Sequence, residues 1–540
     1  MLTGMRRDSF LRGAFILLIG SLASRLLGAV YRFILPWLMG GGDQGAYGMA
    51  LFGMPYSIYS IALVISTMGI PLAISKLVSE ATAVGSVRQV RRVFFVSLGL
   101  LAAMGAVVSA ILYYLSPFLA NQVWQNPDAY YSMVALAPAV FFVAIMSAFR
   151  GLFQGLQAMT PHAISQIVEQ IFRVITMFVM VILLVPRGLK FAAAGATFGA
   201  TVGAFVGVLY LVWVYMRHRN ELWRFEGRDT LEVKTSTTDM IRDILIFAVP
   251  ISISGIIMPL MRFVDAAVVP SRLMASGYSV ITATTSYGYL ESYSMPLVNV
   301  PAVFSAAIAI SLVPSISSSL ARGDHRGIRE KALASLRLAS LIGVPSATGL
   351  FILSTEIPSF FWRAPEAGPV LAAVSGVAVF LTLQQVTSAA LQGMGHPILP
   401  MRNLMVGAVV KFVLTWVLVG IPVLGASGAG LATVAGFLIA ASLNLLSLMN
   451  RIGRFSVTAL LWRATVASAV MGAGVRFTSS ALGVRVGLPF AVMGSVVVGV
   501  VLYGVLILLL GGIRSSDLEM IPRIGSRVAN VLRALRLLRD

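Results

Sequence analysis

The stretch SLASRLLGAVYRFILPWL, residues 21–38, carries Arg25 and Arg32 within an otherwise apolar run. With the apolar residues before it, the run is long enough for a transmembrane helix, which needs about 20 such residues. The two arginines lie seven positions apart, close to two helical turns, so they share one helix face. A charged side chain at membrane depth raises the free energy of insertion by at least ~2.5–3.5 kcal/mol. Such a side chain therefore normally faces a protein interior or a water-filled cavity. Each arginine alone could reach the interface or pair with an acid of a neighbouring helix. Two on one face favour a cavity that receives an anion.

The composition is that of a polytopic membrane protein. Hydrophobic residues make up 58% of the 540, charged residues only 11%, and the mean hydropathy is +0.90. Soluble chains carry about 25% charged residues. Long apolar runs, rather than short alternating ones, predict helices and not barrel strands. The chain has no cysteine and 4 histidines, which argues against a disulfide framework and a metal centre.

The positive charge follows the membrane topology. We expect fourteen spans, the first retained rather than cleaved as a signal peptide. Loop Lys and Arg concentrate after the even-numbered spans and at both ends of the chain, with Arg91 and Arg219 among them. The positive-inside rule then places both termini in the cytoplasm. The net charge of +20 therefore indicates a membrane surface and no nucleic-acid partner. The expected spans lie near 12–38, 46–70, 92–118, 129–153, 163–185, 191–216, 243–269, 285–314, 333–356, 367–392, 400–421, 427–449, 457–480 and 485–511.

The two halves of the chain resemble each other. LFQG at 152–155 returns as ALQG at 390–393, and YRF at 31–33 has a counterpart in MRF at 261–263, with offsets near 230–243 residues. Such collinear matches predict two six-helix lobes related by pseudo-two-fold symmetry about the membrane normal, plus two extra C-terminal helices. The expected parts are an N-lobe (1–217), a cytoplasmic linker (218–240), a C-lobe (241–450), the last two spans (451–512) and a basic tail (513–540).

The basic tail has apolar residues at helical spacing with arginines between them. We expect an amphipathic helix that binds anionic membrane lipids.

Ionisable residues within spans are the candidate functional groups. Glu169 and Arg173 are four apart on one helix, so either an internal ion pair or a cavity role is open to them. The corresponding place in the second half has Lys411 without a nearby acid.

Three more candidates lie at the start of the second half. Arg262 and Asp265 are three apart and could pair, while Asp265 is also a candidate proton or sodium site. Three interpretations of Glu291 are open: a protonated side chain, an ion pair with an arginine of another helix, or a site for the coupling ion. The planar guanidinium fork suits phosphate, so arginines from spans 1 and 7 predict a phosphate-bearing substrate.

Enzymatic motifs are missing from the sequence. It contains no Walker A loop, no HExxH and no GxSxG motif, so we expect a protein that is not an enzyme.

Three segments resemble a known family: RGAFILLIGSLASRLLGAVYR (12–32), MGIPLAISKLVSE (68–80) and FRGLFQGLQAMTPHAISQIVEQIFRV (149–174). They are similar to SpoVB/YtgP-type polysaccharide exporters and MurJ-like lipid II flippases, within the multidrug, oligosaccharidyl-lipid and polysaccharide superfamily. The resemblance implies fourteen helices in two lobes. It also implies transport of an undecaprenyl-diphosphate-linked sugar for peptidoglycan synthesis and cell shape. Arg25 matches the family's span 1 arginine, and Arg32 lies near a second one. The family's span 8 arginine falls at Glu291, and Arg262 is a candidate substitute.

The leading hypothesis is a flippase of the bacterial plasma membrane that moves lipid II from the inner to the outer leaflet by alternating access. Arg25, Arg32 and Arg262 would bind the diphosphate of this lipid-linked oligosaccharide. No cofactor is expected; sodium, protons or the membrane potential would drive transport, through Asp265 or Glu291. The alternatives are a flippase for another lipid-linked polysaccharide, exopolysaccharide or sporulation-specific, and an ion-coupled multidrug exporter. A scaffold for the cell-envelope synthesis machinery is a further alternative.

Overall fold

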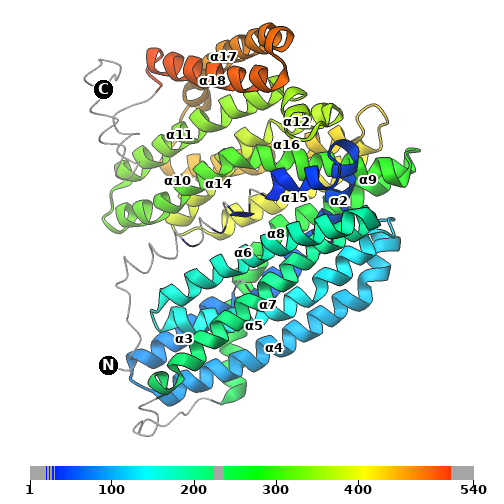
Figure 1. Ribbon diagram of the computed structural model, residues 1–540. Coiled ribbons are helices and arrows are strands. Elements are labelled where there is room, and N and C mark those ends of the chain that lie inside the picture. The colour runs from blue at the N-terminus through cyan, green and yellow to red at the C-terminus, as the bar shows by residue number, and fades with distance from the viewer. Residues whose placement is uncertain are drawn as a thin grey trace. The chain divides into compact units, whose positions relative to one another are not determined.

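The computed structural model describes residues 31–67, 69–223 and 236–512, together with Gly20, Ser24, Leu27 and Gly28 (Figure 1). Arg25, the tail at 513–540 and most of the predicted linker lie outside these residues. Within them all regular structure is helical. The helices are α2 (Gly42–Thr67), α3 (Ile70–Ala83), α4 (Val87–Phe118), α5 (Ala129–Gly155), α6 (Met159–Leu184), α7 (Leu189–Leu222), α8 (Thr237–Ala275), α9 (Val280–Gly288), α10 (Met295–Ala321), α11 (His325–Ile352), α12 (Glu356–Trp362), α13 (Gly368–Val374), α14 (Val377–Gly393), α15 (Ile398–Val419), α16 (Ala426–Ile452), α17 (Val457–Val486) and α18 (Leu488–Leu509). Short π and 3-10 segments are η1 (Leu119–Val123), η2 (Val185–Arg187), η4 (Tyr289–Ser294) and η5 (Pro365–Ala367).

The predicted class, an all-helical polytopic membrane protein, is confirmed. In the described residues, 12 segments are long and apolar enough to cross a membrane. They correspond to twelve of the fourteen expected spans. Of the other two, the span at 243–269 falls within α8, and the span at 12–38 is described from residue 31 onward with four isolated residues before it.

The chain forms two compact units. Unit 1 comprises Met1–Ser271 with Ser279–Thr285, and unit 2 comprises Arg272–Tyr278 with Ser286–Asp540. This division falls within α8 and α9, whereas the sequence predicts the lobe boundary at residues 218–240. The predicted lobe limits stay a prediction.

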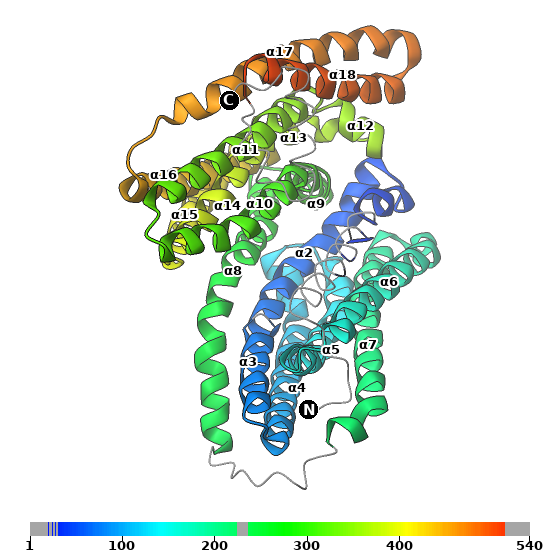
Figure 2. The same ribbon diagram turned by 90° about the vertical axis from the view of Figure 1, so that its left-hand side faces the viewer.

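Unit 1 is built around α5, which packs against α2, α3, α4 and α7, while α6 packs against α7. Its larger core cluster joins α3 and α5 to the first half of α8, through buried side chains such as Ile74, Leu152 and Ile244. Figure 2 shows this half of α8 beside α3. Most of α8 therefore belongs to the same packed body as the first six predicted spans.

Unit 2 has its own core, formed by α10, α11, α14 and α16, with Ile316, Val386 and Leu448 among its buried residues. α17 and α18 pack on each other, and α17 packs on α11. The last two predicted spans are thus attached to this unit through α11.

Corresponding residues make corresponding contacts within each unit. A Cβ added at Gly203 of α7 would lie 2.6 Å from the Glu169 backbone oxygen and 2.9 Å from the Arg173 Cβ, both on α6. A Cβ added at Gly436 of α16 would lie 2.9 Å from the Gly407 oxygen and 2.9 Å from the Lys411 Cβ, both on α15. The paired helices α6–α7 and α15–α16 therefore use the same close approach, as the internal repeat predicts.

Candidate functional site

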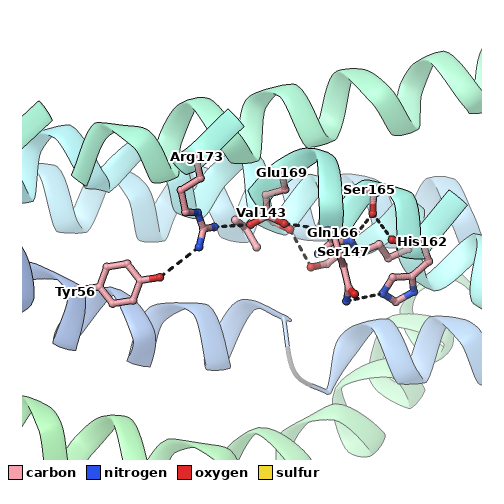
Figure 3. A network of polar contacts seen from close by, with 9 residues as sticks. Tyr56, Val143, Ser147, His162, Ser165, Gln166, Glu169 and Arg173 are labelled. Carbon is pink, nitrogen blue, oxygen red and sulfur yellow. Dashed lines mark hydrogen bonds and ion pairs between the residues drawn. The ribbon is translucent and has the colours of Figure 1, made fainter. Parts of the chain in front are cut away.

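A charged cluster lies between α5 and α6 in unit 1 (Figure 3). The Glu169 carboxylate accepts two hydrogen bonds. Arg150 Nη2 donates to one of its oxygens at 2.9 Å, and Arg173 Nη2 donates to the other at 2.5 Å. All three side chains are only 14% exposed. Two guanidinium groups on one carboxylate leave the cluster with a formal charge of +1.

Uncharged groups extend the cluster in both directions (Figure 3). Arg150 Nε donates to Ser165 Oγ at 3.0 Å, and Ser165 in turn donates to the His162 backbone oxygen. At the other end, Arg173 Nη1 donates to the Tyr56 hydroxyl of α2 at 3.4 Å. The result is a continuous polar path across the three helices α2, α5 and α6.

The turn between α5 and α6 explains why these residues meet. α5 ends at Gly155 and α6 begins at Met159, and Gln157 adopts a φ of 60° in the connection. So short a link folds α6 back along α5. Arg150, in the last turns of α5, is thereby placed beside Ser165 and Glu169 on α6.

Two buried donors near the cluster are unused by the described residues. Arg173 Nε and the Tyr59 hydroxyl have no hydrogen-bond partner in the part of the chain that the structure describes. Buried polar groups are nearly always satisfied, so unsatisfied ones need an explanation. An anionic ligand would supply the acceptor that both donors lack.

Arg32 belongs to the same region. It is half-buried, and both Arg32 and Arg173 act electrostatically on the Tyr56 hydroxyl. Tyr56 stacks on Phe52 at 5.5 Å between ring centroids and packs against Tyr59 at 5.3 Å. The structure thus brings Arg32, Glu169 and Arg173 of the predicted set into one neighbourhood.

The first predicted span runs beside this region. A Cβ added at Gly28 would lie 3.2 Å from the Gln170 side-chain nitrogen, and one added at Gly20 would lie 2.9 Å from the Ala163 Cβ. Both contacts are with α6. Arg25, between these glycines in sequence, lies outside the described residues.

The remaining predicted residues lie elsewhere. Arg262 is half-buried and Asp265 is buried, one turn apart on α8 within unit 1. In unit 2, Glu291 is half-buried in the π-helix η4, and Lys411 is buried on α15. A π-helix within a longer helix often marks a functional position. The roles predicted for these four residues stay predictions.

Arg150 is the member of the cluster that sequence reasoning missed. It lies close to the end of the span predicted at 129–153, where arginine normally reaches the interface. The signal was nevertheless present, because Arg150, Ser165, Glu169 and Arg173 are all polar positions of the segment 149–174 that carries the family resemblance.

Unit 2 has an uncharged network at the corresponding place. Asn403 Nδ2 donates to Asn444 Oδ1 at 2.9 Å, and Asn444 Nδ2 donates to Ser388 Oγ at 3.0 Å. At an offset of 238 residues, Ser388 corresponds to Arg150 and Asn403 to Ser165. At the same offset Glu169 corresponds to Gly407 and Arg173 to Lys411, so the second half keeps one positive charge but has no counterpart of the Arg150–Glu169 ion pair at these positions.

The described residues contain no group of three or more His, Cys, Asp or Glu that could hold a metal ion. The chemistry that this cluster offers is recognition of negative charge.

Fold and cluster together define a multi-pass α-helical membrane protein with arginines in its membrane-embedded interior. The chain belongs to the polysaccharide biosynthesis protein family, whose pattern it matches over residues 10–320. Residues 250–417 also match the MatE family.

Curated relatives of Bacillus subtilis (strain 168) cover nearly the whole chain. The chain is 27% identical to Stage V sporulation protein B over 96% of its length and 99% of that protein. It is 29% identical to the lipid II flippase MurJ of the same organism, over 88% of the chain and 89% of the relative.

A solved structure of lipid II flippase MurJ in an inward closed conformation has the same fold, with a TM-score of 0.69 and 14% identity, covering 92% of this chain and 98% of that one. The predicted family is confirmed. The relatives that are named for an activity, such as the lipid II flippase MurJ, are transport proteins, and the chain is accordingly not an enzyme.

Proposed function

We propose that this protein is a flippase that moves lipid II, an undecaprenyl-diphosphate-linked cell-wall precursor, from the inner to the outer leaflet by alternating access. The diphosphate binds to arginines of unit 1, with Arg25, Arg32 and Arg262 as the primary ligands. Arg173, which like Arg32 acts on the Tyr56 hydroxyl, offers its unused Nε donor. Paired N–H groups of guanidinium match phosphate oxygens in geometry as well as charge.

The charge balance of unit 1 is the observation that carries this proposal. In the described part of unit 1, four arginines are half-buried within predicted spans, leaving aside Arg92 at the first residue of its span, whereas only two carboxylates, Glu169 and Asp265, lie among them. The arginines are Arg32, Arg150, Arg173 and Arg262. An excess of positive charge at membrane depth is costly unless an anion offsets it. A diphosphate headgroup is such an anion.

The setting of the protein follows from the same proposal. It lies in the bacterial plasma membrane with both termini in the cytoplasm, where the basic tail binds anionic lipids. Transport is driven by the membrane potential, or by sodium or protons acting at Asp265 or Glu291. Its product supplies the cell-envelope synthesis machinery that builds peptidoglycan and maintains cell shape.

A second candidate is a flippase for another lipid-linked polysaccharide, exopolysaccharide or sporulation-specific. It is favoured by the likeness to Stage V sporulation protein B, which extends over 99% of that protein. Both candidates need the same diphosphate ligands and differ only in the sugar. An ion-coupled multidrug exporter fits less well, because a cationic drug calls for an acidic site rather than an arginine-rich one.

The test is rescue of a bacterium depleted of its lipid II flippase. We expect the wild-type gene to restore growth and the Arg25→Ala, Arg32→Ala double variant to fail at equal membrane expression. Rescue by both genes would preserve the function and refute the arginine mechanism. Failure of both would refute lipid II as the substrate and favour another polyprenyl-linked glycan.

A further inference from the structure

A second cationic site lies in unit 1, at the end of the helices predicted to face the cytoplasm. The start of α4 and the end of α7 enclose a cavity of about 540 Å³. It is lined by Arg91, Phe95, Tyr215, Met216, Arg219, Asn220 and Trp223. None of these residues belongs to the Arg150–Glu169–Arg173 cluster.

Aromatic side chains make up three of the seven residues that line this cavity, namely Phe95, Tyr215 and Trp223. The Tyr215 ring packs on Phe94 at 5.4 Å and on Phe149 at 5.8 Å between centroids. Trp223 Nε1 donates to the Tyr215 hydroxyl at 3.1 Å. The hydroxyl accepts this bond and keeps its own proton as a donor. These contacts hold Tyr215 in place, so that its hydroxyl is a donor available to a ligand in the cavity.

Among the described residues, the charged side chains that line the cavity are both arginines. Arg91 and Arg219 are exposed at the cavity, Asn220 adds an amide, and no Asp or Glu is part of the lining. Arg91 also lies over the Phe95 ring, 5.8 Å from its centroid, which holds its guanidinium group near the apolar side. Arginine, asparagine and tyrosine donors around one space suit phosphate oxygens.

The surroundings of the cavity are those of a lipid boundary. Phe95 is 45% exposed and Met216 is 67% exposed, so large apolar side chains line the rim. α4 belongs to a span whose most apolar 18-residue window has a mean hydropathy of 2.3 and only 22% of its residues buried. Basic groups beside such an apolar rim match the two parts of a phospholipid, a charged headgroup and an acyl chain.

We infer that this cavity is a binding site for the phosphate headgroup of an anionic phospholipid in the cytoplasmic leaflet. Arg91, Arg219 and Asn220 bind the phosphate, Tyr215 donates to it, and the acyl chains lie along Phe95 and Met216. The site is separate from the proposed transport site and retains a lipid that is not transported.

The experiment measures lipid retention by the purified full-length chain with native mass spectrometry. Phosphatidylglycerol and phosphatidylcholine are titrated in turn, and inorganic phosphate and glycerol 3-phosphate serve as soluble competitors. The test variant is Arg91→Gln, Arg219→Gln. The matched control is Arg88→Gln, Arg217→Gln, which removes two positive charges from the same ends of α4 and α7 but at exposed positions outside the cavity, with Arg217 over Trp213.

We expect wild type to prefer phosphatidylglycerol and the double variant to bind it roughly thirtyfold more weakly, because each of the two arginines near an anionic headgroup contributes about 1 kcal/mol. The control should change the affinity by less than about threefold, since solvent and salt screen a charge outside the site. All these side chains are exposed, so folding should be unaffected.

Three results would overturn the inference. The control could weaken binding as much as the double variant, or phosphatidylcholine could bind as tightly as phosphatidylglycerol. Alternatively, glycerol 3-phosphate could displace the lipid completely and protect the chain from thermal unfolding equally well. The last result would make the ligand a soluble phosphate ester instead of a lipid.

Discussion

Glu169 supplies the negative charge with which two largely buried arginines, Arg150 and Arg173, form ion pairs. Replacing it with the isosteric amide leaves both guanidinium groups without a counter-charge, and breaking a buried ion pair on one side typically costs about 3–5 kcal/mol. We therefore expect Glu169→Gln to lower the free energy of unfolding by about 3–5 kcal/mol, measured by denaturant titration in detergent micelles.

Glu80→Gln is the matched control for this substitution. Glu80 pairs with Lys76 at 3.8 Å, with both side chains more than half exposed. Exposed pairs contribute about 0–1 kcal/mol, so this variant should be nearly as stable as wild type. Equal losses in the two variants would show that the buried cluster does not stabilise unit 1.

Arg150 makes two directional contacts, through Nη2 to Glu169 and through Nε to Ser165. Lysine keeps the charge but does not reproduce the planar fork. We expect Arg150→Lys to lose about 1.5–3 kcal/mol, roughly the value of one hydrogen bond involving a charged group, and Arg150→Ala to lose more. Wild-type stability in the lysine variant would mean that charge alone matters at this position.

At the scale of the elements, close packing of α6 on α7 holds the cluster in place. A Cβ at Gly203 would meet the Glu169 backbone oxygen at 2.6 Å, so Gly203→Ala should push the helices apart and lower the thermal midpoint. Gly504 of α18 has nothing within 4 Å of an added Cβ. Because alanine is favoured over glycine in helices by about 1 kcal/mol, Gly504→Ala should be neutral or stabilising. Effects of the same sign and size would contradict this packing account.

The elements show what the sequence could and could not predict. The span expected at 129–153 is observed as α5, Ala129–Gly155, because apolar length alone defines a membrane helix. Hydropathy does not distinguish the i→i+5 hydrogen bonds of a π-helix from the i→i+4 bonds of an α-helix. The π-helix η4 around Glu291 could therefore not be predicted from the sequence. The Glu169–Arg173 pair follows from a spacing of four residues, whereas Arg150 enters the cluster only through the fold of the α5–α6 turn.

At the scale of the whole molecule, the polar networks at corresponding places of the two halves differ in charge. The first half has the Arg150–Glu169–Arg173 cluster, and the second has the uncharged network of Asn403, Asn444 and Ser388. Arg150 and Arg173 of the first half correspond to Ser388 and Lys411 of the second, and Glu169 corresponds to Gly407. The two halves have therefore kept the helix packing while diverging in the chemistry between the helices. We interpret the first half as the main carrier of the ligands for the diphosphate.

The most direct test of this central claim is leaflet translocation by purified protein. Lipid II with a fluorescent headgroup label is incorporated into both leaflets of proteoliposomes, and a membrane-impermeant reductant is added outside. We expect wild type to expose the inner pool, so that fluorescence falls below the level set by the outer leaflet alone. The Arg25→Ala, Arg32→Ala variant, monodisperse and as thermally stable as wild type, should stop at that level, as protein-free liposomes do. Full translocation by the double variant, or none by wild type, would contradict the account.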